Sequence, residues 1–185
     1  MKLGTLVLLL ALVTAPACGG GGGSDSGIGP SPSPISANFV PDQPAPGAKT
    51  VAMLYSSKSN DVVSVIVSLT DTSSVYGAAF EVAFDPAGAA YMGFTHGAAF
   101  EAGGNAPAYT LDGSSNPGRI VAGVARTNGT TTNIVGSKAV VILQFRVKQT
   151  GTFPVTLQNG NVYGGQVPPL PIASIQWFAG ALTGI

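Results

Sequence analysis

The stretch DVVSVIVSLTDTSSVYGAAFEVAFDP, residues 61–86, decides the fold class of this chain. Apolar side chains occupy every second position in its first part and again in its last part, and the turn-forming run Thr-Asp-Thr-Ser stands between them at 70–73. Alternation with a period of two, in β-branched and aromatic residues, is typical of a strand that buries one face. The stretch therefore predicts two strands, over 61–69 and 78–86. The side chains expected to face the core are Val63, Val65, Val67, Leu69, Phe80, Val82 and Phe84.

The same pattern continues along the rest of the chain. The run AVVILQFRVK, residues 139–148, predicts a third strong strand, with Val141, Leu143, Phe145 and Val147 facing inward. Asn-Gly, Asp-Pro and Gly-Gly pairs stand between the strand patterns and are typical of turns. After the strand over 78–86 the sequence allows one helical turn over 86–94, and no longer helical period occurs outside the N-terminal apolar run. Nine short strands with regular turns predict an all-β protein, a β-sandwich. The weaker strands are expected over 51–55, 108–111, 119–125, 153–157, 172–178 and 181–185.

The N-terminus has the pattern of an export signal. A positive start is followed by an apolar run over 3–13 and by Ala-Pro-Ala at 15–17, directly before Cys18, the only cysteine of the chain. The apolar run is too short to span a membrane and is typical of a secretory signal peptide. Residues 15–18 also resemble the bacterial lipobox, in which the cysteine is lipidated and becomes the first residue. Ordinary signal cleavage and lipoprotein cleavage would both cut the bond between Ala17 and Cys18, and they differ only in whether Cys18 carries lipid. Because a lone exposed thiol would be open to oxidation, we predict a signal peptide over 1–17 and lipid attachment at Cys18.

Residues 18–47 are predicted to form a tether. They pass from GGGGGSDSG to the proline-rich runs PSPSPIS and PDQPAPG. Glycine- and serine-rich chain is flexible and proline-rich chain is extended, and neither buries enough apolar surface to fold. The domain is expected over 48–185. This organisation predicts an exported protein that is lipid-anchored at the cell envelope, in the outer membrane or at the cell surface, and that meets the membrane only through its lipid.

Composition and motifs argue against several classes of function. Charged residues make up 9 % of the chain and the formal net charge is zero, so no basic surface is available for nucleic acid. One cysteine and one histidine, His96, cannot supply a structural zinc site or a disulfide. Glu81 and Asp85 would lie about 13 Å apart along a strand, which is too far for the paired carboxylates of a glycosidase. We therefore predict no catalytic residues and no metal site, and we expect that the protein is not an enzyme.

Calcium is left open as an alternative to having no cofactor. Four aspartates stand near predicted loops, and a calcium site would need several of their oxygens to cluster around one point. Sequence alone does not show whether they do. The four residues are Asp61, Asp71, Asp85 and Asp112.

The order of several segments resembles that of a cohesin-type domain. The matching segments are FEVAFDP, YMGFTHGAAF, NPGRIVAGVA and GSKAVVILQFRVKQTGTFPVTL, and with the opening stretch they cover most of the domain. Cohesins are the modules that receive dockerins in cellulosomes, and their fold is related to that of some carbohydrate-binding modules. The resemblance implies a jelly-roll β-sandwich of about nine strands and a non-catalytic module that binds a protein partner, with a dockerin-bearing protein as the candidate. Gly77 and Ala79 stand where many cohesins carry polar contact residues, so no contact residue of the family is carried over.

Three residues are the predicted members of a binding face. Glu81 points outward from its strand, Tyr163 is followed by two glycines, and Tyr76 precedes the strand that carries Glu81. Exposed tyrosines would equally suit a glycan, so a carbohydrate-binding module of the same fold remains an alternative, as does a structural envelope lipoprotein. Trp177, in the apolar run IQWFAG, is expected to pack in the core instead.

Overall fold

The computed structural model describes residues 34–101, 106–165 and 168–185. These described residues form one compact unit. The predicted signal peptide, Cys18 and the first part of the predicted tether lie outside the described residues. No helix that is long and apolar enough to cross a bilayer occurs in the part of the chain that the structure describes.

The unit is built from ten strands, and the described residues contain no helix. The strands are β1 (Ala37–Pro41), β2 (Thr50–Ser59), β3 (Val62–Phe84), β4 (Ala89–His96), β5 (Ala108–Asp112), β6 (Arg119–Ala125), β7 (Thr132–Val147), β8 (Gly151–Gly164), β9 (Gln176–Phe178) and β10 (Gly180–Gly184).

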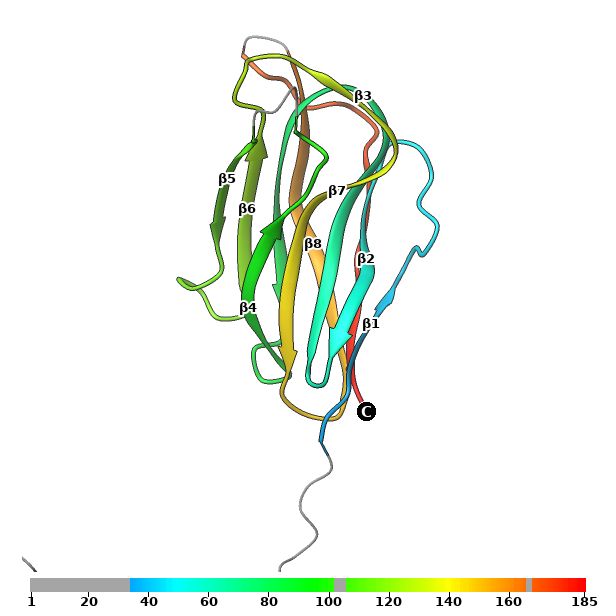
Figure 1. Ribbon diagram of the computed structural model, residues 1–185, viewed down its shortest axis with the longest axis vertical. Helices are drawn as coiled ribbons and strands as arrows, with labels where there is room; N and C mark the ends of the chain where they lie inside the picture. Colours follow the sequence, from blue (N-terminus) through cyan, green and yellow to red (C-terminus); the bar gives the residue numbers. More distant parts are fainter. Residues whose placement is uncertain (1–33, 102–105, 166–167) are drawn as a thin grey trace, which may run out of the picture. The chain divides into compact units, whose positions relative to one another are not determined.

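The long strand β3 belongs to both layers of the structure (Figure 1). Its first part pairs with β2 and β7, and the same layer continues through β9 beside β2 and β4 beside β7. Its second part pairs with β6 and β8, and that layer continues through β5 on one side and through β10 and β1 on the other. The predicted jelly-roll β-sandwich is confirmed.

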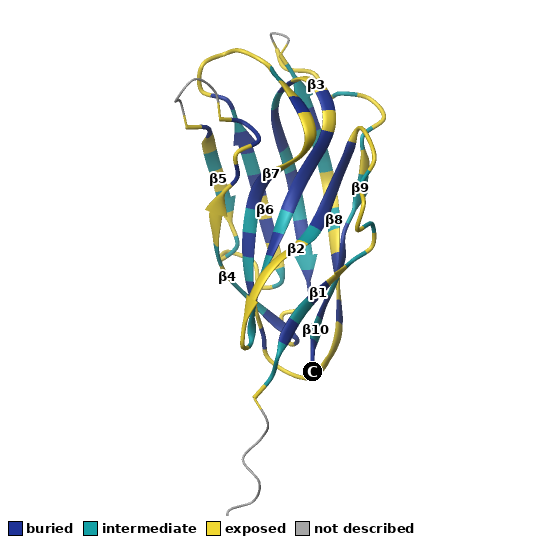
Figure 2. Ribbon diagram, turned by 45° about the vertical axis from the view of Figure 1, so that its right-hand side comes forward, coloured by how far each residue is buried: buried dark blue, intermediate teal, exposed yellow. Residues whose placement is uncertain are grey.

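The core lies between the layers and follows the predicted alternation. Buried side chains alternate with more exposed ones along β3 and β7 (Figure 2). Phe84 of β3 meets Phe145 of β7 edge to face, with ring centroids 5.3 Å apart. The eleven side chains that the sequence predicts to face inward from β3 and β7 are all buried: Val63, Val65, Val67, Leu69, Phe80, Val82, Phe84, Val141, Leu143, Phe145 and Val147.

The prediction of two separate strands over 61–86 is wrong, because β3 runs through the expected turn at 70–73. Asp71 and Ser74 have φ angles of 37° and 55° there, in the left-handed region, and the register with β7 shifts on both sides of Thr72. The Asp71 carboxylate accepts a hydrogen bond from the Gly136 amide at 2.6 Å. The turn-forming residues therefore bend β3 where it passes from one layer to the other, without ending it.

Two further segments form strands that the sequence analysis did not predict. β4 lies where one helical turn was expected, and it pairs with β7 across an irregularity at Gly93, whose φ of 139° suits glycine. β1 lies inside the predicted tether and pairs with β10, with Phe39 buried. The folded unit therefore begins well before residue 48. The sequence did not predict this strand, because five residues next to prolines carry too short an alternation to recognise.

The lengths of the later strands also differ from the predictions. β8 continues through the Asn159-Gly160 pair, which was expected to be a turn, and β9 is shorter than the predicted strand over 172–178. The pair forms a bulge instead, since Asn161 faces Ala79 while Gln158 faces Glu81 on β3.

Candidate functional site

The candidate site is the outer face of the layer in which β8, β3, β6 and β5 lie side by side (Figure 1). Along the second part of β3, Ala78, Phe80 and Val82 are buried, so Ala79 and Glu81 between them point outward. The register places Ala79 between Gly123 of β6 and Asn161 of β8. Each strand of the face thus contributes every second residue to one surface.

A hollow of about 440 Å³ lies on this face. Its floor consists of small residues from β3, β5 and β6, and its polar groups are few. Gly77 is required there, because an added Cβ atom would lie 2.7 Å from the Val124 carbonyl oxygen. Gly123 is not constrained in this way, since its added Cβ would meet only the Thr110 carbonyl oxygen, at 3.9 Å. The lining residues are Tyr76, Gly77, Ala78, Ala79, Ala108, Thr110, Gly123, Val124, Ala125, Tyr163 and Pro169.

Two of the three predicted site residues border this hollow. Tyr76 and Tyr163 line it from β3 and β8, which pair along this part of the layer. Among the described residues that line it, none carries a charge. Gly77 and Ala79 make the floor of the hollow low and apolar.

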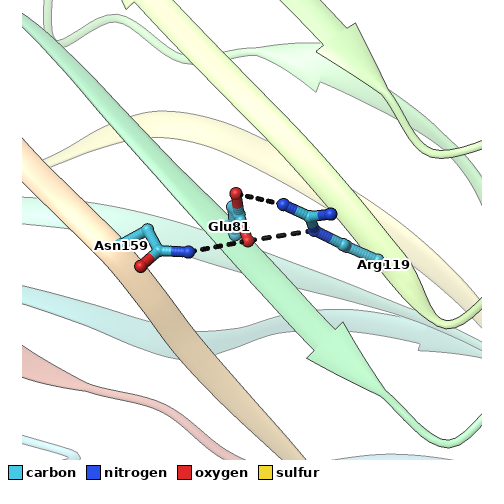
Figure 3. A network of polar contacts seen from close by, with 3 residues as sticks. All are labelled: Glu81, Arg119 and Asn159. Atoms are coloured by element: carbon cyan, nitrogen blue, oxygen red, sulfur yellow. Dashed lines mark hydrogen bonds and ion pairs between the residues drawn. The ribbon is translucent and has the colours of Figure 1, made fainter. Parts of the chain in front are cut away.

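The third predicted residue, Glu81, is the centre of a polar network further along β3. Its carboxylate accepts hydrogen bonds from Arg119 Nε at 2.9 Å and from Asn159 Nδ2 at 3.0 Å, and Arg119 Nη2 forms a second contact with it (Figure 3). The hydrogen bond from Arg119 is the main reason why the pKa of Glu81 is lowered from its ordinary value of 4.5, with a smaller contribution from Asn159. Glu81 is therefore held as an anion with fixed partners beside the apolar hollow.

The bulge in β8 explains why Asn159 reaches Glu81. Asn159 has a φ of 49°, and the extra residue re-aims side chains at this point of the strand. Gly160 packs directly against Trp177, because an added Cβ would lie 2.5 Å from the indole ring. Trp177 also lies 6.2 Å from the Phe80 ring and packs against the core, as the sequence analysis predicted.

A second cluster of aromatic rings lies where the edge strands β4 and β5 meet. The rings of His96 and Tyr109 stack in parallel, with centroids 4.2 Å apart, and Phe94 lies within 6.0 Å of both. The Tyr109 hydroxyl donates to the Gly97 carbonyl at 2.9 Å and so joins the two layers. His96 is exposed. Its stacking partner Tyr109 comes from another strand, so this contact could not be predicted from the sequence around His96.

The four aspartates considered for calcium each have a separate local role. Asp61 pairs with Arg146 at 3.1 Å, Asp71 binds the Gly136 amide, and Asp85 binds the Ala87 amide. Asp112 accepts hydrogen bonds from the amides of Ser114 and Ser115, and contacts with these two serines lower its pKa to about 2. Among the described residues, no three potential metal-ligating side chains come together.

Sequence reasoning missed several residues of the face. Arg119, Val121 and Gly123 lie on β6, and Val121 is 42 % exposed although it is apolar. The alternation in GRIVAGVA shows which β6 residues share a face, but it does not show that β6 lies beside β3. The pairing of β3 with β6 on one side and β8 on the other places Arg119 and Asn159 on either side of Glu81.

Two sheet layers joined through one continuous strand place the protein among the jelly-roll β-sandwich modules. The cohesin-domain profile matches residues 50–167, and the chain belongs to the cohesin family. Cohesin domains are non-catalytic binding modules. A search of the curated proteins gave no match.

Solved structures of cohesins share the fold at low sequence identity. A non-cellulosomal cohesin from Archaeoglobus fulgidus is 13 % identical, with a TM-score of 0.51, and the match covers 78 % of this chain and 88 % of that chain. The second type II cohesin module of the adaptor scaffoldin ScaA from Acetivibrio cellulolyticus is 10 % identical, with a TM-score of 0.55 and coverages of 82 % and 89 %. A type II cohesin–X–dockerin complex from the same organism matches with 11 % identity, a TM-score of 0.52 and coverages of 78 % and 93 %.

Proposed function

We propose that this protein is a non-catalytic docking module that binds a protein partner through the outer face of β8, β3, β6 and β5. The observation that carries the proposal is the apolar hollow on that face, next to the polar network around Glu81. An apolar centre with an ordered polar surround is the arrangement of a protein–protein interface. The proposed partner is a dockerin-type module, since one of the similar structures is a cohesin–dockerin complex.

The chemistry of the hollow favours a protein over a sugar. A sugar ring carries several hydroxyl groups, and each one loses hydration on binding unless the site offers it a hydrogen bond. Apart from main-chain atoms, the lining offers the hydroxyl groups of Thr110, Tyr76 and Tyr163. An apolar side chain would need no such partners.

The proposal includes anchoring at the cell envelope. Lipid on Cys18 would hold the protein at the outer side of a bacterial membrane, and residues 19–36 would span at most about 60 Å when extended. This spacer is shorter than the sequence analysis predicted, because β1 already belongs to the folded unit. The module would meet its partner away from the lipid surface.

The test is direct binding of dockerin-type modules encoded in the source genome, measured by calorimetry with and without a calcium chelator. We expect at least one module to bind, and chelation to abolish binding if the partner folds around calcium. Absence of binding by every such module, with the protein shown to be folded, would contradict the proposal. Labelling of cells with a radioactive fatty acid, comparing the natural chain with Cys18→Ala, tests the anchor separately.

The aromatic cluster of Phe94, His96 and Tyr109 favours a glycan-binding module as the second candidate function. Part of the cluster is exposed, and planar rings can pack against the apolar face of a sugar. Affinity electrophoresis in gels that contain different polysaccharides tests this candidate. Retardation that is lost in Phe94→Ala and kept in Tyr163→Ala would support it, and unchanged mobility in every gel would exclude it.

A further inference from the structure

The hollow on the β8–β3–β6–β5 face is shaped by the absence of side chains rather than by a gap between elements. Gly77 and Gly123 have no side chain, and Ala79 lies between β6 and β8 with only a methyl group. Tyr76 and Tyr163 also line it. A hollow of about 440 Å³ over such a floor leaves room for a side chain that comes from outside.

The backbone around the hollow is already paired. The second part of β3 pairs with β6 on one side and with β8 on the other, and β6 pairs with β5. An added strand would find no free main-chain groups in the middle of this layer. Recognition at this point therefore depends on a side chain of the partner.

The charges of the face determine what kind of side chain fits. The described residues that line the hollow carry no charge, so a buried ammonium or carboxylate would lose its hydration without compensation there. The nearest ionic pair on the face, Glu81 with Arg119, is neutralised within the protein and lies about two to four residues further along β3. A neutral, apolar occupant matches the hollow.

The geometry points to an anchor site for one large apolar side chain, of the leucine or phenylalanine type, presented by the protein partner. This inference rests on the proposed docking function and deepens it, because it names the chemistry of the contact. It also assigns Gly123 as the residue that keeps the site open. A buried central contact of this kind dominates the affinity of many interfaces.

Gly123→Leu is the sharpest variant for a test, since it fills the hollow from its own floor. An added Cβ at Gly123 has no neighbour closer than 3.9 Å, so the substitution is compatible with the fold. Gly47→Leu is the matched control: the same residue change at an exposed loop position with no atom within 4 Å. Equal thermal unfolding of the two variants and the natural chain establishes that all three are folded.

The probe is N-acetyl-leucine amide, followed by amide chemical shifts in NMR spectra, with N-acetyl-lysine amide and cellobiose as comparisons. We expect saturable shifts at Gly77, Ala79 and Gly123 with the leucine compound in the natural chain and in Gly47→Leu. These shifts should be lost at Gly77 and Ala79 in Gly123→Leu, and neither comparison compound should cause them. No shift with the leucine compound, or equal shifts in Gly123→Leu, would overturn the inference.

A second measurement separates this inference from the docking function itself. A dockerin-type module that binds the natural chain should bind Gly123→Leu at least tenfold more weakly, and Gly47→Leu with unchanged affinity. Equal binding to both variants would overturn the anchor site while the docking function stands. If no module binds but the leucine compound causes the expected shifts, the docking function fails and the apolar site stands.

Discussion

At the scale of single residues, Glu81 and Gly77 decide the character of the candidate face. Glu81 is an outward carboxylate on β3, and its two neighbours across the strands turn it into an ordered anion. Gly77, four residues earlier on the same strand, is a position where a side chain would meet the backbone of β6. The polar and apolar halves of the face thus depend on individual side chains.

Stability should depend on the ionisation of Glu81. Its pKa is lowered in the folded protein, so its contribution is present above the ordinary value of 4.5 and is lost as the pH falls through the lower folded value. We expect Glu81→Gln to lower the free energy of unfolding at pH 7, and the difference from the natural chain to shrink below pH 4.5. Urea titrations at pH 7 and at pH 3 measure this. A difference of the same size at both pH values would refute the explanation.

Gly77→Ala should destabilise the fold, whereas Gly123→Ala should not. The methyl group at position 77 would lie 2.7 Å from the Val124 carbonyl oxygen, so the pairing of β3 with β6 must shift. The expected loss is about 1–3 kcal/mol for Gly77→Ala, against about 0.5 kcal/mol or less for Gly123→Ala. Chemical denaturation of the two variants checks the difference, and equal losses would contradict the close-contact argument.

At the scale of elements, β1 and the bulge in β8 are two features that the sequence did not predict. β1 pairs with β10 along five residue pairs and buries Phe39, although the sequence around it is rich in proline. The bulge at Asn159-Gly160 lets β8 continue past a turn-forming pair, and it brings Asn159 to Glu81. Both elements depend on a partner strand that is distant in the sequence.

Phe39→Ala should therefore destabilise the whole unit. Phe39 is 2 % exposed, and removal of a buried aromatic side chain costs about 3–5 kcal/mol. Val40→Ala, at the next and mostly exposed position of β1, is the control and should change stability by about 0.5 kcal/mol or less. Thermal or urea unfolding of both variants tests whether β1 is part of the cooperative fold. Small and equal effects would mean that β1 is dispensable.

At the scale of the whole molecule, the shared strand β3 joins the two layers into one structure. Neither layer contains all of β3, and the core between them takes side chains from both of its parts. The single cysteine, at position 18, leaves no disulfide to hold the unit together. Its stability must come from packing and from strand pairing.

Unfolding of the unit should accordingly be a single cooperative transition. The only tryptophan, Trp177, packs near Phe80 and β9, whereas circular dichroism reports on all strands. We expect the fluorescence and circular dichroism curves to coincide in urea, as two-state unfolding requires. Separate midpoints would show that the two layers unfold independently.

The sequence by itself determined the strands and their buried faces, because alternation with a period of two is a local property that each segment carries alone. It correctly placed the side chains of β3 and β7 that form most of the core, and the order of its segments indicated the cohesin family. It also selected Tyr76, Glu81 and Tyr163 as members of a binding face, without the residues that surround them. Only the tertiary structure decided that β3 bends at Asp71 without ending, that β1 adds to β10, and that Arg119 and Asn159 meet at Glu81. Those features depend on which strands become neighbours and in what register, and contacts between residues far apart in the chain leave no periodic pattern in the sequence.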